Sequence, residues 1–307
     1  MNRKIITLLL VIVSLNVNNN IKSYIPEKFK LLKSGYDNAE EAIEPQNKIV
    51  YQDTKITLTT KDGLFRKAIL SIVNNAKGNV VLCHPAAKHK EYMQSYREQL
   101  FPQYNTIAFD FRRHGEDQKK QYSTIGRDER YEVEAAAKIF KQDSRTKNLP
   151  TYGFGISLGA VAIIELESRQ HTFDGIIIQS AYESLKKQIM RLYQFYRLPH
   201  MHHFIFRQPC RGFAYYCYRI KLRKIFPSTS ISKITTPIFL IHALNDTFIS
   251  INAYVELKKN AKSVVKTWNP EFGNHTKILK TYPELYAQHC NDFLDSLQNK
   301  SYITKSK

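Results

Sequence analysis

The pentapeptide Gly-Ile-Ser-Leu-Gly at residues 155–159 decides how this chain folds. A strand-like run at 150–154 precedes it, and a helix-like run at 158–167 follows it. A sharp turn from strand to helix brings backbone close to backbone, so both flanking positions require glycine. The serine between them is held in a strained, exposed conformation at the end of a sheet. The pattern therefore predicts a nucleophile, Ser157, at a strand-to-helix turn.

Two residues downstream of Ser157 could activate it. A serine hydroxyl is a poor nucleophile at neutral pH, and it needs a base that a third group orients. Asp246 follows an apolar, strand-like run at 237–242, and His275 follows a second such run at 263–268. Open α/β sheets build their sites at the carboxyl ends of strands, so we expect both residues at the site. Two alternatives stay open: Asp246 could cap the helix that follows it, and His275 could be an ordinary loop histidine.

Strand-like and helix-like runs alternate along most of the chain. This alternation predicts an α/β fold with a mostly parallel central sheet and helices on both faces. The turn Lys61-Asp62-Gly63 joins the first two strands, because Asp-Gly favours a hairpin. The predicted strands are 49–58, 64–73, 79–84, 106–111, 150–154, 175–179, 237–242 and 263–268, and the predicted helices are 127–142, 158–167 and 282–298.

Five segments occur in an order that is typical of one family. Residues 80–85 end a strand in His-Pro, residues 108–115 read Ala-Phe-Asp-Phe-Arg-Arg-His-Gly, and residues 153–160 hold the serine turn. Residues 234–246 deliver an aspartate after a strand, and residues 273–275 read Gly-Asn-His. Together the segments resemble the α/β-hydrolases, and more narrowly their compact esterase and serine-aminopeptidase-like branch. The resemblance covers roughly residues 50 to 300 and implies the α/β-hydrolase fold with a small helical cap insertion.

The resemblance assigns a role to each matching residue. Ser157 would be the nucleophile, His275 the general base and acid, and Asp246 the carboxylate that orients the histidine. The oxyanion hole would use the backbone N–H of Leu158 and that of Ala86, in the loop after the strand at 79–84. The family chemistry implies no metal and no organic cofactor.

The chain departs from the family pattern at two positions. Pro85 replaces the usual glycine and has no N–H to offer, but Ala86 can still serve as the donor. Arg113 stands where the family prefers glycine. Three further polar residues near these segments are expected to order the loops through hydrogen bonds and not to react: His84, Asp110 and His114.

The chain is strongly basic, with 46 Lys and Arg against 27 Asp and Glu and a formal net charge of +19 over 307 residues. Such a surplus favours anionic surfaces or substrates. No nucleic-acid-binding motif accompanies it, so we expect no specific nucleic-acid partner. No Cys/His spacing resembles a zinc site, and the histidines at 200, 202 and 203 have no carboxylate near them in sequence.

The chain divides into four predicted parts. Residues 1–20 begin with positive charges and a short apolar run, which is typical of a signal peptide or an N-terminal anchor; the run is too short for a comfortable membrane span. We expect export to a periplasmic or extracellular location, or anchoring to a membrane, with a cytoplasmic location as the alternative. A polar arm (21–45), the α/β domain (46–300) and a tail (301–307) follow. Cys210 and Cys217 could form a disulfide in an oxidising compartment.

The predicted cap insertion spans about residues 184–232. No Asp or Glu occurs between Glu183 and Asp246, whereas Lys, Arg, Tyr and Phe are interleaved densely within the insertion. This composition suits contact with anionic lipid headgroups, or a pocket for an acyl chain that carries an acidic group. The alternative is that the aromatic side chains pack on the domain while the cations face water.

These patterns predict a serine hydrolase that cleaves a carboxylic ester, of a lipid or a small acyl ester, through an acyl-enzyme. A serine peptidase or a thioesterase would use the same triad. The alternative from another class is a non-catalytic binding protein or a membrane-tethered protein that works through the basic, aromatic cap.

Overall fold

The computed structural model describes residues 51–115, 123–195 and 225–305. The predicted leader (1–20), the polar arm (21–45), Cys210, Cys217 and the middle of the predicted cap (196–224) lie outside these residues. Of the cap insertion, the described parts are α6 (Leu185–Phe195), α8 (Pro227–Ser230) and the 3₁₀ turn η5 (Ile231–Lys233).

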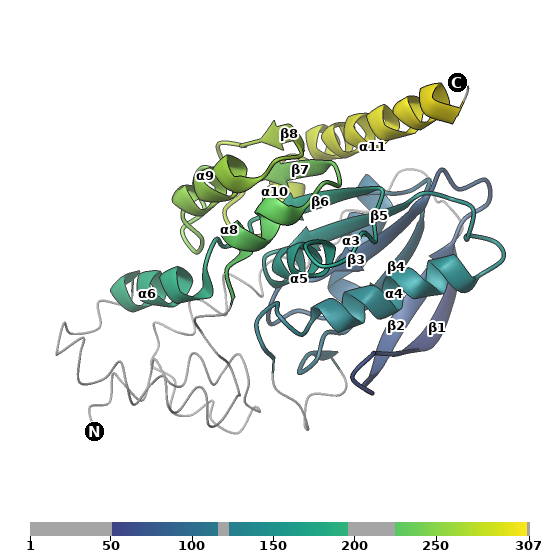
Figure 1. Ribbon diagram of the computed structural model, residues 1–307, viewed down its shortest axis with the longest axis horizontal. Coiled ribbons are helices and arrows are strands. Elements are labelled where there is room, and N and C mark those ends of the chain that lie inside the picture. The colour runs from purple at the N-terminus through teal and green to yellow at the C-terminus, as the bar shows by residue number, and fades with distance from the viewer. Residues whose placement is uncertain (1–50, 116–122, 196–224, 306–307) are drawn as a thin grey trace.

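One sheet of eight strands forms the centre of the described molecule, in the order β1-β2-β4-β3-β5-β6-β7-β8 (Figure 1). Strand β2 pairs antiparallel with both β1 and β4. From β4 to β8 in this order, every pair of neighbouring strands runs parallel. The strands are β1 (Gln52–Thr59), β2 (Phe65–Ile72), β3 (Asn79–Cys83), β4 (Asn105–Phe109), β5 (Thr151–Ile156), β6 (Gly175–Gln179), β7 (Ile238–Ile241) and β8 (Val264–Trp268). The mostly parallel α/β sheet predicted from the sequence is confirmed.

Helices cover both faces of the sheet. Neighbouring residues of a strand point to opposite faces, and β3 shows this clearly: Val81 and Cys83 join one buried cluster with α4 and α5, and Val80 and Leu82 join another with α3 and α11. The remaining elements are η2 (Lys90–Met93), α3 (Gln94–Leu100), α4 (Arg130–Gln142), α5 (Leu158–Glu167), α9 (Ile251–Asn260), α10 (Ile278–Thr281) and α11 (Pro283–Lys305).

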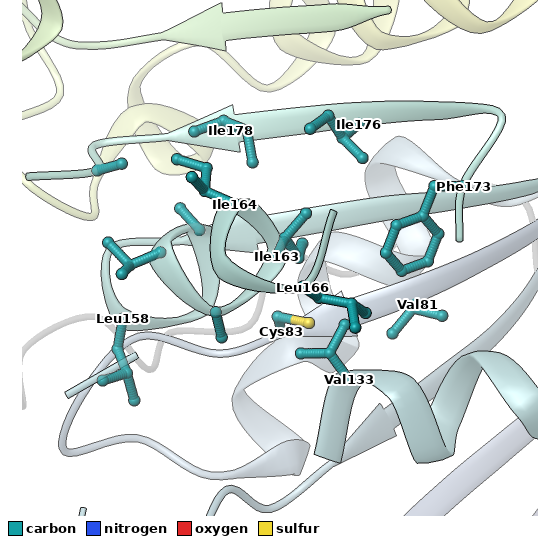
Figure 2. Packing of buried hydrophobic residues seen from close by; sticks show 14 of the residues in the cluster. Val81, Cys83, Val133, Leu158, Ile163, Ile164, Leu166, Phe173, Ile176 and Ile178 are labelled. Atoms are coloured by element: carbon teal, nitrogen blue, oxygen red, sulfur yellow. The ribbon is translucent and has the colours of Figure 1, made fainter. Parts of the chain in front are cut away.

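Helix α5 is buried along its whole length. Its packing on all sides therefore holds the helix, and the turn before it, in one position. Ile163 and Ile164 lie beside Ile176 and Ile178 of β6 in Figure 2, while Leu166 faces α4. Full burial of each such side chain stabilises the fold by about 1.5–3 kcal/mol. A helix held on all sides cannot shift without losing several of these contacts, so the turn that precedes it is held as firmly as the core.

The structure corrects the sequence prediction in three places. The predicted tail begins too early, because α11 continues to Lys305; no proline or glycine follows Pro283 to end the helix. Helix α3 was not predicted, because it is short and mostly polar. Helix α9 was predicted without bounds, only as a helix that follows Asp246. Among the described helices, none combines the length and the apolar character that crossing a bilayer requires.

Candidate active site

Ser157 occupies a tight turn between β5 and α5. Its backbone has φ 54° and ψ −109°, a conformation that costs a non-glycine residue free energy. A Cβ on Gly155 would lie 2.6 Å from the backbone carbon of Gly159, and a Cβ on Gly159 would lie 2.3 Å from the carbonyl oxygen of Cys83. Both positions therefore exclude every side chain. This is the close approach for which the sequence predicted two glycines.

Asp246 follows β7 and uses its two carboxylate oxygens differently. Oδ1 accepts hydrogen bonds from the backbone N–H groups of Phe248 and Ile249, both at 2.9 Å. Oδ2 faces the ring of His275. The N-cap of α9 is Ser250, whose hydroxyl accepts from the N–H of Asn252, so Asp246 is not the cap of that helix.

The carboxyl group of Asp246 is held in its ionised form. Burial is the largest influence and acts to raise its pKa, but the charge of His275 and its hydrogen bond, with the charge of His242 and the Ile249 N–H, outweigh burial. The pKa of Asp246 therefore lies below its usual value.

His275 lies between β8 and α10, and its ring is fixed on one side. Nδ1 is 2.9 Å from Oδ2 of Asp246. A carboxylate only accepts, so Nδ1 carries the proton and Nε2 presents its lone pair. The ring packs against Phe248 with centroids 4.9 Å apart. Nε2 is buried and has no hydrogen-bond partner among the described residues, which is the state that a general base requires before its substrate arrives.

The structure places Ser157, Asp246 and His275 after β5, β7 and β8, all at the carboxyl edge of the sheet. It brings Asp246 and His275 into direct contact. Within the described part of the chain, no hydrogen bond joins the Ser157 hydroxyl to His275. The serine and histidine segments are connected through Gln179 at the end of β6: its carbonyl accepts from the Ser157 N–H at 2.9 Å, and its Nε2 donates to the carbonyl of His275 at 3.4 Å.

The two proposed oxyanion donors lie at the same edge. Leu158 is the first residue of α5, where helix geometry leaves the N–H without an acceptor. Ala86 is half-buried in the loop after β3. Strands β3 and β5 are parallel neighbours, and the first turn of α5 presses on the end of β3 at Cys83. Neither N–H donates to a backbone acceptor in the described part of the chain.

Buried polar residues tie the loops beneath the site together. His84 donates from Nδ1 to the carbonyl of Pro85 at 2.7 Å and accepts at Nε2 from the N–H of Phe111 at 3.2 Å. Burial lowers the pKa of His84 well below its usual value, so the ring is neutral. His84 thus connects the loop that carries Ala86 to the loop after β4.

Asp110 and His114 hold the loop after β4. Asp110 accepts from the backbone N–H and the ammonium group of Lys90, at 2.8 and 3.0 Å, and His114 donates from Nδ1 to the carbonyl of Arg112 at 2.9 Å. These contacts agree with the ordering role expected of both. Arg113 adopts φ 67°, a left-handed conformation that favours glycine, which fits the glycine that the family resemblance implies at this position.

Sequence reasoning missed three residues around Ser157, Asp246 and His275. Phe248 packs on the ring of His275, and Gln179 connects two site segments. His242 donates from Nε2 to the carbonyl of Ile249 at 3.0 Å and lies 3.7 Å from Asp246; burial lowers its pKa, partly opposed by Asp246. One signal was available, because a glutamine that ends a buried run of isoleucines needs a polar partner.

No group of three or more His, Cys, Asp or Glu side chains that could hold a metal ion occurs within the described ranges. The groups that the structure brings to this edge of the sheet include the serine, the histidine, the carboxylate and backbone N–H groups.

Comparison with known proteins places this architecture among solved structures. No family model matches the sequence. The uncharacterised protein YqkD of Bacillus subtilis is 22% identical over 283 residues, which is 88% of each chain. The Pyrococcus furiosus esterase Pf2001 superposes with a TM-score of 0.64 at 23% identity, over 83% of this chain and 96% of the esterase. The Pyrococcus horikoshii acylaminoacyl peptidase gives a TM-score of 0.60 at 15% identity, over 82% of this chain and 42% of the peptidase. The chain shares the fold of these structures.

Proposed function

We propose that this chain, which has the α/β-hydrolase fold, is a serine hydrolase that cleaves the carboxylic ester of a lipid or a small acyl ester through an acyl-enzyme. One observation carries the proposal: His275 is bonded to Asp246 through Nδ1, while its buried Nε2 has no partner among the described residues. A buried, unpartnered nitrogen costs free energy, and this one lies at the edge of the sheet where Ser157 occupies its strained turn.

The proposed reaction has two halves. The hydroxyl oxygen of Ser157 attacks the ester carbonyl carbon while Nε2 of His275 takes its proton, and the N–H groups of Leu158 and Ala86 bind the oxyanion. The tetrahedral intermediate then expels the alcohol, which receives the proton from His275. In the second half His275 takes a proton from water, the hydroxide attacks the acyl-enzyme, and the acid leaves as Ser157 regains its proton. Asp246 stabilises the charged imidazole in both halves.

The structural neighbours include, by their names, an esterase and an acylaminoacyl peptidase. A serine peptidase and a thioesterase would use the same residues, so the leaving group separates these activities. A purely binding protein is disfavoured, because binding alone gives no chemical reason for a strained serine turn and an oriented histidine with an unpartnered Nε2 at one edge.

The first test is labelling with a fluorescent fluorophosphonate, which reacts with an activated serine. The wild-type protein should label, and Ser157→Ala should not. Ser296→Ala, which removes an exposed serine of α11, is the matched control and should label as the wild type does. A folded wild-type protein that stays unlabelled would reject the hydrolase proposal.

The second test compares leaving groups on the wild-type enzyme that has not been treated with the fluorophosphonate. We expect kcat/KM to be highest for p-nitrophenyl esters across a series of acyl chain lengths, lower for the matching thioesters, and lowest for aminoacyl p-nitroanilides. A higher value for the anilides would move the assignment to a peptidase.

We further propose that the N-terminal segment directs export or membrane anchoring, and that the basic, aromatic cap contacts anionic lipid. The support comes from the sequence of residues 1–20 and 184–232, together with the net charge of +19. Cell fractionation and co-sedimentation with vesicles, either neutral or one-third anionic, should compare the full chain with a variant that lacks residues 1–20. If both proteins stay soluble and neither binds anionic vesicles, the membrane proposal fails.

A further inference from the structure

Gln179 is the last residue of β6, the strand between the one that leads to Ser157 and the one that leads to Asp246. Its side chain has no exposed surface. Burying an amide is costly unless its donor and acceptor are both bonded. The residues of β6 that precede Gln179 are apolar. Packing alone would therefore favour an apolar residue at this position, so we look to the hydrogen bonds of the amide for its role.

Each polar group of Gln179 is bonded to a different part of the molecule. The carbonyl accepts from the N–H of Ser157 at 2.9 Å, Nε2 donates to the carbonyl of His275 at 3.4 Å, and Oε1 accepts from the hydroxyl of Tyr286 at 2.5 Å. Because Oε1 and Nε2 have separate partners, the orientation of the amide is fixed. Gln179 therefore connects the turn at Ser157, the loop that contains His275 (the histidine loop) and α11.

Tyr286 fixes this amide from the core. Its side chain is fully buried and packs against Trp268, with ring centroids 5.2 Å apart. Burial raises the pKa of Tyr286 well above its usual value, so the hydroxyl stays protonated and donates. The residue after His275 is held in the same way, because the Thr276 carbonyl accepts from the hydroxyl of Tyr96 at 3.3 Å. The main chain of the histidine loop is thus anchored by buried side chains from beneath.

We propose that Gln179 is a positioning residue, held by Tyr286, that keeps the His275 imidazole in register with Ser157. This inference rests on the serine hydrolase function proposed above. His275 must take a proton from Ser157 and return it, and a displacement of about 1 Å at such a site can cost about 100-fold in rate. Gln179 touches neither substrate nor the transferred proton; it acts through the backbone of both residues.

The first test is Tyr286→Phe, which removes the hydroxyl that orients the amide. Its matched control is Tyr104→Phe, which removes a buried hydroxyl that has no partner among the described residues. We expect Tyr286→Phe to lower kcat by about 10- to 100-fold at unchanged KM, and Tyr104→Phe to leave kcat as it is. Both melting temperatures should be measured, so that a loss of kcat can be compared with any loss of stability.

Gln179→Glu gives a signature that a merely structural residue would not show. The protonated carboxyl can donate to the His275 carbonyl and accept from Tyr286, as the amide does, whereas the ionised carboxylate cannot donate. Burial keeps such a carboxyl protonated at acidic pH. The ratio of kcat in Gln179→Glu to kcat in the wild type should therefore be near one at the acid end and fall as pH rises.

A measurement without turnover separates this proposal from the proposed function. NMR of ¹⁵N-histidine-labelled protein reports the Nδ1 proton of His275, assigned by its loss in His275→Gln. We expect that signal to shift or broaden in Tyr286→Phe and Gln179→Glu, and to stay unchanged in Tyr104→Phe. An unlabelled, inactive wild type with these shifts would reject the hydrolase and retain the positioning role. Unchanged His275 signals would overturn the positioning role, and so would a kcat ratio that stays near one after the introduced carboxyl has ionised.

Discussion

The two ends of the parallel strands bury polar groups in different ways. At the amino ends, the groups bond to one another. Nδ2 of Asn79 donates to the carbonyl of Thr146 at 3.0 Å, and its Oδ1 accepts from Nδ2 of Asn105 at 3.0 Å. Oδ1 of Asn105 in turn accepts from the N–H of Val73 at 3.1 Å. The donors and acceptors of both amides are satisfied, as stable interiors require.

The carboxyl ends hold residues with strained backbone conformations and buried polar atoms without hydrogen-bond partners. Ser157, Ser180 and Asn274 have φ values of 54°, 51° and 43°, and each such conformation costs about 1–3 kcal/mol. The hydroxyl of Ser180 and Nε2 of His275 are buried without partners among the described residues. The carboxyl ends, where the proposed chemistry takes place, therefore hold strained residues and unpartnered atoms, whereas the Asn79–Asn105 pair at the amino ends is fully bonded.

Replacing the histidine should separate activity from stability most strongly. We expect His275→Ala to lower kcat by a factor of about 10⁴–10⁶. The melting temperature should also fall, but the fold survives, because the variant loses only the Nδ1 bond to Asp246 and the packing on Phe248. His289→Ala is the control, because Nδ1 of His289 is also buried without a described partner, but its ring packs on Trp268 and Phe239 and not on Asp246. Ester hydrolysis and thermal unfolding measure the two effects. Equal losses of kcat in both variants would contradict the assignment.

The opposite result is expected at the amino ends. Asn79→Ala leaves several buried groups without a partner, so the free energy of unfolding should fall by about 2–4 kcal/mol. The kcat per folded molecule should stay that of the wild type. Asn252→Ala, at an exposed position of α9, should change the unfolding free energy by less than about 0.5 kcal/mol. Urea unfolding gives these values, and a normal stability with a low kcat would reverse the comparison.

Two buried serines sharpen the contrast at smaller scale. Ser180→Ala removes an unpaired hydroxyl, so the free energy of unfolding should stay level or rise by up to about 1 kcal/mol. Ser71→Ala removes a hydroxyl that accepts from Arg97 at 2.8 Å, and the free energy should fall by about 1–2 kcal/mol. A fall of similar size in both variants would show that the Ser180 hydroxyl is bonded after all.

The smallest expected effect is a pH dependence. The folded-state pKa of Asp246 is lowered, so its ionised form stabilises the fold above the unfolded-state pKa of about 3.9, and this contribution is lost as pH falls through the folded-state value. The Asp246→Asn variant lacks this stabilisation, because an amide does not ionise. The difference in melting temperature between the wild type and Asp246→Asn should be constant above about pH 5 and shrink below about pH 4. A difference that grows on acidification would mean a raised pKa.

The sequence predicted best where local and global constraints agree. Helix α5 and strand β6 have the bounds that the sequence predicted, because glycines, β-branched residues and unbroken apolar runs leave few alternatives. The turn at Ser157 was predictable for the same reason, since its two glycines have a steric cause that is local.

What the sequence could not predict depends on contacts between distant residues. Gln179 and Tyr286 are 107 positions apart, and nothing near either one indicates the other. The insertion of β4 between β2 and β3 in the sheet is a matter of topology and not of any one segment. Helix α3 escaped prediction because its interior contacts are Tyr96, Arg97 and Leu100 within a polar segment.

The position of Tyr286 in α11 also sets an order of events during synthesis. Ser157 leaves the ribosome more than a hundred residues before Tyr286, the residue that fixes Gln179. A nascent chain therefore carries this serine before the proposed base, His275, has been made. In the proposed hydrolase, the serine can become reactive only after α11 has been synthesised.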